Sequence, residues 1–137
     1  MKFKFIEHTA DIGIEAYGET WEEAFENAAL GMFEIMTDTK KIGTKKKMEI
    51  MASGEDMKSL LYDFLEQFLI LHDSENLVFS KVKIIELNNN KLKAEVWGEE
   101  FNPDKHEDRT SVKAITYHQM EIIEKDSKKT IRFIVDI

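Results

Sequence analysis

The sequence predicts a single α+β domain: mainly antiparallel sheet with two amphipathic helices packed on it, in two layers. Two stretches carry apolar residues at helical spacing, and most of the second half of the chain alternates as strands do. The turns between these late strands are short, and only antiparallel strands can be joined so tightly. The 137 residues suit one domain, and no repeat or linker divides residues 1–137.

Two short strands and a helix are expected first. Residues 3–6 and 12–17 are apolar or alternating, and a polar segment separates them. Thr20 is placed to cap the first helix, with Glu23 as its capping-box partner, and the helix ends near residues 37–39. Its apolar stripe consists of Trp21, Ala24, Phe25, Ala28, Met32, Phe33 and Met36.

A third strand and a second helix follow. The strand is expected over residues 48–51. We expect the helix to begin at Ser53, with Asp56 at the capping-box position, and to end at residues 72–74. Its buried stripe consists of Met57, Leu60, Leu61, Phe64, Leu65, Phe68 and Leu69.

The rest of the chain is predicted to be all strand and turn. A change in the phase of alternation near Ser80 indicates a bulge in the first of these strands. The strands are expected over residues 77–87, 92–96, 111–123 and 131–137, separated by turns at 88–90 and 126–129 and a polar loop at 102–109.

Composition excludes several classes of function. The chain has no cysteine, which rules out disulfides, thiolate zinc sites, iron–sulfur clusters and a cysteine nucleophile. The net charge of −8 argues against a protein that binds nucleic acid by itself. It is compatible with a site for a hard cation or with a basic protein partner. Apolar runs are too short to span a membrane and no signal peptide is evident, so we expect a cytoplasmic protein.

Both ends of the chain carry candidate ligands. His8 and Asp11 lie three apart between two strands, where they could bind a metal or act as acid and base. The alternative is a turn in which Asp11 satisfies backbone amides. Asp136 and the terminal carboxylate of Ile137 end a strand side by side and repel each other unless a cation lies between them. The alternative there is a hydrated chain end.

Three other features stand out. Asp38 follows the first helix, at the unfavourable end of its dipole, and could cap the next turn or serve a ligand. Residues 111–118, which include Lys113 and His118, alternate poorly for a strand, as functional segments often do. They could equally form a central strand. The lysine run 40–47 is either a solvated loop or a contact for RNA or an acidic partner.

Together these segments resemble the archease family. The resemblance covers residue 5 to the last residue and rests on motifs at 8–13, 24–29 and 36–38 near the start and at 112–118 and 135–137 near the end. Residues 40–108 match mainly in their pattern of helices and strands.

The resemblance implies a small accessory protein rather than a stand-alone enzyme. Archeases activate the tRNA-splicing RNA ligase, which uses GTP and a divalent metal, by promoting guanylylation of its active-site histidine and repeated turnover. Contact with tRNA would be only indirect. The family carries an acidic metal site, which by motif would use Asp11, Asp38, Asp136 and the Ile137 carboxylate, with Lys113 nearby. Oxygen ligands favour calcium, magnesium or manganese over zinc.

Two other functions compete with this one. Some family members have a chaperone-like role toward a tRNA methyltransferase, which would depend on exposed apolar surface. A metal-dependent hydrolase that uses His8 and the acidic cluster would turn over a phosphoester without a partner.

Overall fold

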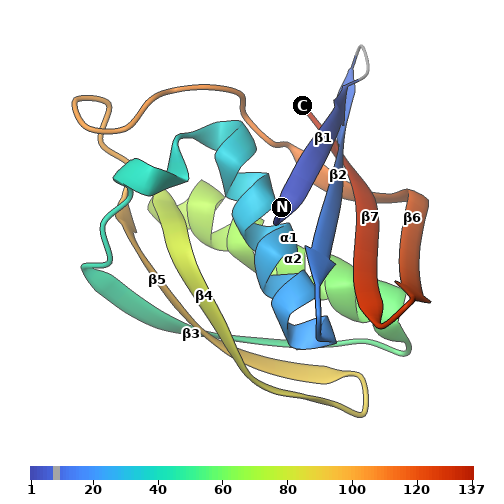
Figure 1. The fold of residues 1–137 in the computed structure, drawn as a ribbon. Helices are drawn as coiled ribbons and strands as arrows, with labels where there is room; N and C mark the ends of the chain where they lie inside the picture. Colours follow the sequence, from blue (N-terminus) through green and yellow to red (C-terminus); the bar gives the residue numbers. More distant parts are fainter. Residues whose placement is uncertain (8–9) are drawn as a thin grey trace.

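The computed structural model describes residues 1–7 and 10–137, and its strands and helices follow the expected order (Figure 1). The α+β class is confirmed, and every strand pairing among the described residues is antiparallel. The elements are β1 (Phe3–Glu7), β2 (Asp11–Gly18), α1 (Trp21–Met36), the 3-10 turn η1 (Thr39–Lys41), β3 (Lys46–Ser53), α2 (Met57–Glu75), β4 (Leu77–Asn88), β5 (Lys91–Glu100), β6 (Ala114–Lys125) and β7 (Lys128–Asp136).

The strands form two sheets, with the helices between them. One sheet has the order β1-β2-β7-β6 and the other β3-β5-β4. Helix α1 packs on β2 and β4, and α2 packs on β3 and β6, so each helix touches both sheets (Figure 1). The fold therefore has three layers, sheet, helices and sheet, where two were expected. The reason is that α1 buries residues around most of its circumference, including Ala24, Phe25, Ala29 and Ile35, and a single sheet cannot cover them all.

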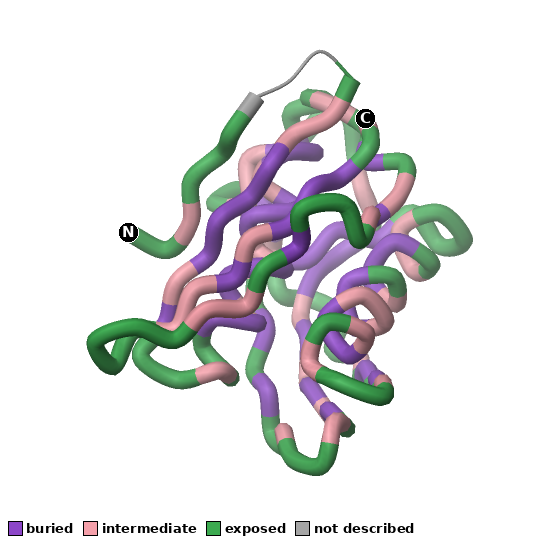
Figure 2. Tube along the Cα trace, turned by 90° about the vertical axis from the view of Figure 1, so that its right-hand side faces the viewer, coloured by how far each residue is buried: buried purple, intermediate pink, exposed green. Residues whose placement is uncertain are grey.

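Phenylalanine side chains fill the core between the helices and β4. Phe33 lies edge-on to Phe68 and Phe79, with ring centroids 5.7 and 5.5 Å apart, and all three are fully buried. Figure 2 shows buried stretches along β2 and β7, whereas β1 at the edge of their sheet is largely exposed. Neither helix of the described chain is long and apolar enough to cross a membrane.

The capping of the first helix by Thr20 is as predicted, and the start of the second helix is not. Thr20 caps α1, its hydroxyl accepting a hydrogen bond from the Glu23 amide at 3.1 Å. The expected start at Ser53 is wrong, because Ser53 still pairs with β5. Asp56 caps α2 instead, accepting from the Ser59 amide at 2.8 Å, while the Ser59 hydroxyl accepts from the Asp56 amide at 3.1 Å. Asp56 is the N-cap because its carboxylate is placed to accept the hydrogen bond of the Ser59 amide.

Register shifts interrupt the late strands at three places, two in β4, at Phe79/Lys81 and Ile84/Glu86, and one in β6. The bulge predicted near Ser80 is confirmed as the register shift between Phe79 and Lys81. Strand β6 begins at Ala114 rather than Ser111, and its residues 117–120 face the single residue Phe133 of β7. Gln119 has a left-handed φ of 55°, and the bulge turns the following methionine inward. This bulge explains the poor alternation of this segment.

Candidate functional site

Three strand ends meet where β7 finishes. Asp11 opens β2 and lies directly opposite Asp136 in the β2–β7 register. On its other side Asp136 lies opposite Ala114 of β6, and its carbonyl accepts a hydrogen bond from the Lys113 amide at 2.8 Å. The Ile137 amide donates to the Ala10 carbonyl at 3.4 Å. The start of β2 and the last residue of the chain thus meet at one end of the sheet, which we call the β2–β7 tip.

The β2–β7 tip places like charges together. Residues directly opposite each other in an antiparallel pair project from the same face, so Asp11 and Asp136 share one face, and like charges so placed destabilise the pair. Asp136 is exposed and Asp11 is half-buried. Oδ1 of Asp11 is buried and has no hydrogen-bond partner among the described residues. A buried acceptor left unpaired costs about 1–3 kcal/mol.

A hydroxyl that sequence reasoning missed lies one row further along the same face. Thr116 is opposite Ile134, two residues from the Ala114–Asp136 pair, and its Oγ1 is also buried without a partner among the described residues. Oxygen atoms that lack donors are what a hard divalent cation coordinates. Asp11, Asp136 and the Ile137 carboxylate thus offer oxygen atoms of the kind that calcium, magnesium and manganese accept as ligands.

Asp38 is at the same end of the molecule but has a different local role. It caps η1, its Oδ1 accepting from the Lys40 amide at 3.1 Å, which is the capping role left open above. No hydrogen bond or ion pair of the described residues joins it to Asp11 or Asp136. No three acidic, histidine or cysteine side chains in the described chain form a cluster suited to a metal. The structure thus brings together the aspartates of β2 and β7, without Asp38.

The other candidate residues, Lys113, His118 and His8, differ in their position relative to the β2–β7 tip. Lys113 is exposed beside the Asp136 carbonyl. His118 is exposed within the β6 bulge, beyond Thr116, and so lies further from the β2–β7 tip. His8 lies outside the described residues.

A strap formed by residues 109–113 joins the end of α1 to the tip. The amides of Arg109 and Thr110 donate to carbonyls in the last turn of α1, at 3.1 and 3.2 Å. The Arg109 guanidinium donates to the Glu34 carboxylate at 2.5 Å and to the carbonyls of Glu34 and Thr37 at 2.9 and 3.4 Å. A cation there is favoured by the helix dipole. These bonds fix the strap that leads to Lys113.

Replacing Arg109 by methionine is expected to lower the free energy of unfolding by about 1–3 kcal/mol, since the variant lacks the ion pairs with Glu34 and Glu107 and two bonds to carbonyls. Urea denaturation followed by circular dichroism measures the change. The matched control is Lys125→Met, at an exposed position without an ion pair among the described residues. Equal effects of the two substitutions would contradict the role given to Arg109.

A buried network, which the sequence did not reveal, fixes the loop before the strap. The Glu99 carboxylate accepts from the Gly43 amide at 2.6 Å, the Lys105 ammonium at 2.7 Å and His106 Nε2 at 2.8 Å. His106 Nδ1 accepts from the Asn102 amide, so the proton is on Nε2. Burial raises the pKa of Glu99, but these three donors outweigh it and hold the pKa at about 2. No local pattern predicts this network, because Gly43 is distant in sequence.

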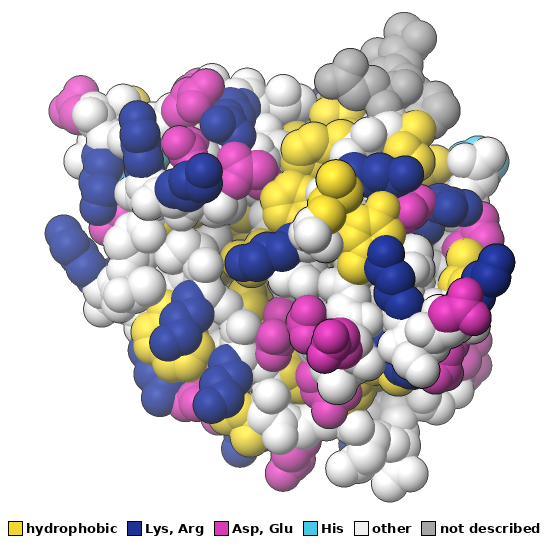
Figure 3. Space-filling view, in the orientation of Figure 1, with side chains coloured by type: hydrophobic (Ala, Val, Ile, Leu, Met, Phe, Trp, Pro, Cys, Tyr) yellow, Lys and Arg dark blue, Asp and Glu magenta, His cyan; other side chains and the backbone are white. Residues whose placement is uncertain are grey.

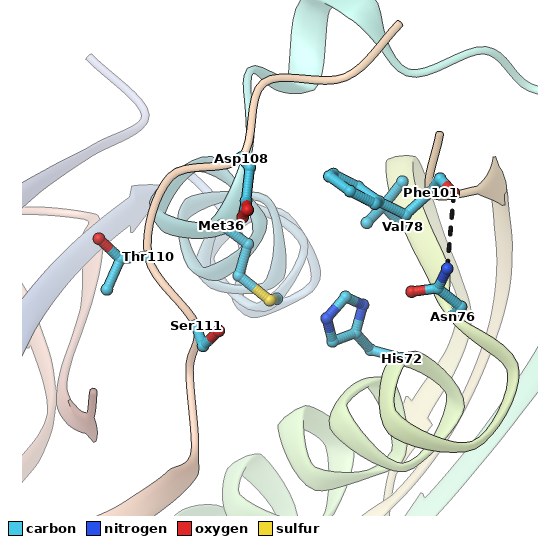
Figure 4. Close-up of a pocket in the computed structure, with 8 residues that line it drawn as sticks. All are labelled: Met36, His72, Asn76, Val78, Phe101, Asp108, Thr110 and Ser111. Atoms are coloured by element: carbon cyan, nitrogen blue, oxygen red, sulfur yellow. Dashed lines mark hydrogen bonds between the residues drawn. The ribbon is translucent and has the colours of Figure 1, made fainter. Parts of the chain in front are cut away.

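A small cavity lies between the strap and the end of α2. It has a volume of about 180 Å³, and Figure 4 shows Met36 and His72 directed into it beside Ser111. His72 Nδ1 is already within 2.9 Å of the Leu77 carbonyl. Ligand pockets are about 300–1,000 Å³, so this cavity is too small for an organic substrate.

Comparisons with known proteins agree on one family. The model of the Archease protein family (MTH1598/TM1083) matches residues 3–137. The chain is 54% identical to protein archease of Sulfolobus acidocaldarius over 137 residues, with 99% of each chain covered. It is 50% identical to protein archease of Thermococcus kodakarensis over 141 residues, again with 99% of each covered.

Two solved structures have the same fold. The solution structure of Methanobacterium thermoautotrophicum protein 1598 superposes with a TM-score of 0.81 at 42% identity and covers 98% of both chains. The crystal structure of an archease from Thermotoga maritima, described as a possible chaperone, gives a TM-score of 0.67 at 26% identity, covering 98% of this chain and 96% of the other.

Proposed function

The chain belongs to the archease family, and from that membership we propose that it acts in the cytoplasm as a non-catalytic activator of the GTP- and metal-dependent tRNA-splicing RNA ligase. It would promote guanylylation of the ligase histidine and allow repeated turnover. The observation that carries the proposal is the Asp11–Asp136 pair beside Ile137, in which one buried carboxylate oxygen has no donor among residues 1–7 and 10–137.

The β2–β7 tip would act by bringing oxygen ligands to the ligase. Asp11, Asp136 and the Ile137 carboxylate would hold a divalent ion, and the half-buried Asp38 at the same end could join them once the partner is bound. A bound ion neutralises phosphate charge during nucleotidyl transfer. Lys113 is exposed next to Asp136, where its ammonium can approach a phosphate or a carboxylate of the partner. The strap holds its backbone in place.

The test is multiple-turnover ligation by the cognate ligase with GTP and manganese, at substoichiometric amounts of this protein. We expect strong stimulation that Asp136→Ala abolishes, because the variant lacks one of the two paired carboxylates. Asp73→Ala, which removes an exposed carboxylate of α2, should stimulate normally. Normal stimulation by Asp136→Ala would contradict the proposal. The same mixture without ligase tests for phosphoester turnover by the protein alone.

A chaperone-like role toward a tRNA methyltransferase is the second candidate. Strand β1 is at an edge of its sheet and exposes apolar residues, with Phe5 40% and Ile6 37% exposed. Edge strands with apolar side chains are sites of association, and the Thermotoga maritima relative is described as a possible chaperone. If this role is correct, the chaperone-like effect on the methyltransferase would survive Asp136→Ala and would be lost on Phe5→Ser.

A further inference from the structure

A tryptophan on the outer sheet has a lysine on each side. Lys47 of β3 and Lys81 of β4 are both cross-strand partners of Trp97 in β5. Their ammonium groups lie 5.5 and 4.5 Å from the centroid of the indole ring. The three side chains form one row across the face of the sheet that points away from the helices, and both cations are held against an aromatic surface.

More lysines lie at the same end of this sheet. Lys46 pairs with Gly98, the residue after Trp97. Lys45 and Lys46 line a hollow of about 420 Å³, together with Lys105 of the loop that follows β5 and the carboxylates Glu99 and Glu100. Figure 3 shows lysine and arginine side chains gathered on this side of the molecule. We call Lys47, Lys81 and Trp97 the lysine–tryptophan face; Lys45 and Lys46 add positive charge at its end, with Lys46 on the other side of β3 from Lys47.

The positive charge of this face is only partly balanced. Glu95 forms an ion pair with Lys47, and Glu99 is buried and bound to Lys105. Lys45, Lys46 and Lys81 have no ion pair among the described residues, and Lys45, Lys46, Lys47 and Lys81 are all exposed. The protein as a whole has a net charge of −8, so this local excess of cations opposes its overall charge. Such a face is complementary to a polyanion.

We propose that the lysine–tryptophan face binds single-stranded RNA, with phosphates at the lysines and a base stacked on Trp97. Lysine binds phosphate as a point charge, and stacking of a base on an aromatic side chain contributes about 1–3 kcal/mol. An acidic protein would satisfy the lysines but would make no use of the indole. This RNA-binding surface is separate from the β2–β7 tip and goes beyond the proposed function, in which tRNA is reached only through the ligase.

The test is fluorescence anisotropy of a labelled oligouridine with the full chain carrying Trp21→Phe, which leaves Trp97 as the only tryptophan. We expect binding at about 50 mM salt that weakens steeply by about 200 mM, together with quenching of Trp97 emission. Lys47→Gln/Lys81→Gln should weaken binding about tenfold and lower the slope of log K against log salt by about 1.4, or about 0.7 for each lysine–phosphate pair removed. Trp97→Leu, in the native background, should weaken binding without changing that slope.

A matched double variant separates local from general charge effects. Lys58→Gln/Lys125→Gln removes the same charge at exposed positions on α2 and β6, and it should bind as the parent does. Circular dichroism confirms that each variant is folded. An equal weakening of binding in both double variants, or no binding at about 50 mM salt, would overturn the proposal. Equally tight binding of poly-L-glutamate would also overturn it and would indicate an acidic protein partner.

Discussion

Replacement of Asp11 by asparagine is expected to abolish the stabilisation of this protein by divalent metal ions while making the metal-free protein slightly more stable. The Asp11→Asn variant lacks the negative charge that faces Asp136 across the β2–β7 pair, which removes a repulsion of roughly 0.5–1 kcal/mol. The same change takes away a ligand that a hard cation needs. In the parent protein, an ion present at a hundred times its dissociation constant should add about 2.7 kcal/mol, or roughly 6–10 °C in melting temperature.

Thermal unfolding with and without manganese or calcium measures both effects. Asp73→Asn, at an exposed site of α2, is the matched control and should keep the full metal-induced shift. A metal-induced shift that persists in Asp11→Asn would mean that the ion binds elsewhere. A fall in the stability of the metal-free variant would mean that the Asp11 carboxylate has a donor in solution.

The elements could be predicted from the sequence because their signals are local. Spacing and alternation predict the order of strands and helices, and the phase change at Ser80 locates a real bulge. Prediction fails where distant residues decide the outcome. Ser53 was expected to begin a helix but is held in β3 by its pairing with Lys91. The number of layers depends on which sheet covers each side of α1, and no local pattern contains that information.

The candidate site was predictable to a similar degree. The sequence singled out Asp11 and Asp136 separately, and only the β2–β7 register makes them neighbours. The capping of η1 by Asp38 was foreseen as one of two alternatives. The buried oxygen of Thr116 could not be foreseen, because its row depends on how the β6 bulge realigns the strand. His106 carries no local signal, since the carboxylate that it binds, Glu99, also depends on the distant Gly43 amide.

Lowering the pH from about 4.5 to about 2 is expected to remove a stabilising contribution of about 3 kcal/mol from the buried Glu99 network. Burial raises the pKa of Glu99, but bonds from Lys105, Gly43 and His106 outweigh it and lower the pKa from 4.5 to about 2. A group whose pKa is lower in the folded state stabilises the fold fully above its ordinary value. That contribution is lost as the pH falls toward the folded pKa.

The Glu99→Gln variant isolates this contribution, because all other carboxyl groups titrate in both proteins. At pH 7 the variant should be less stable by about 3 kcal/mol, since it leaves two buried or half-buried donors without their anionic partner, and the difference should shrink toward zero near pH 2. Urea denaturation across this pH range measures the difference, and Glu100→Gln, at the exposed next position, should show almost none. A difference that stays constant with pH would mean that Glu99 acts through packing and not through its charge.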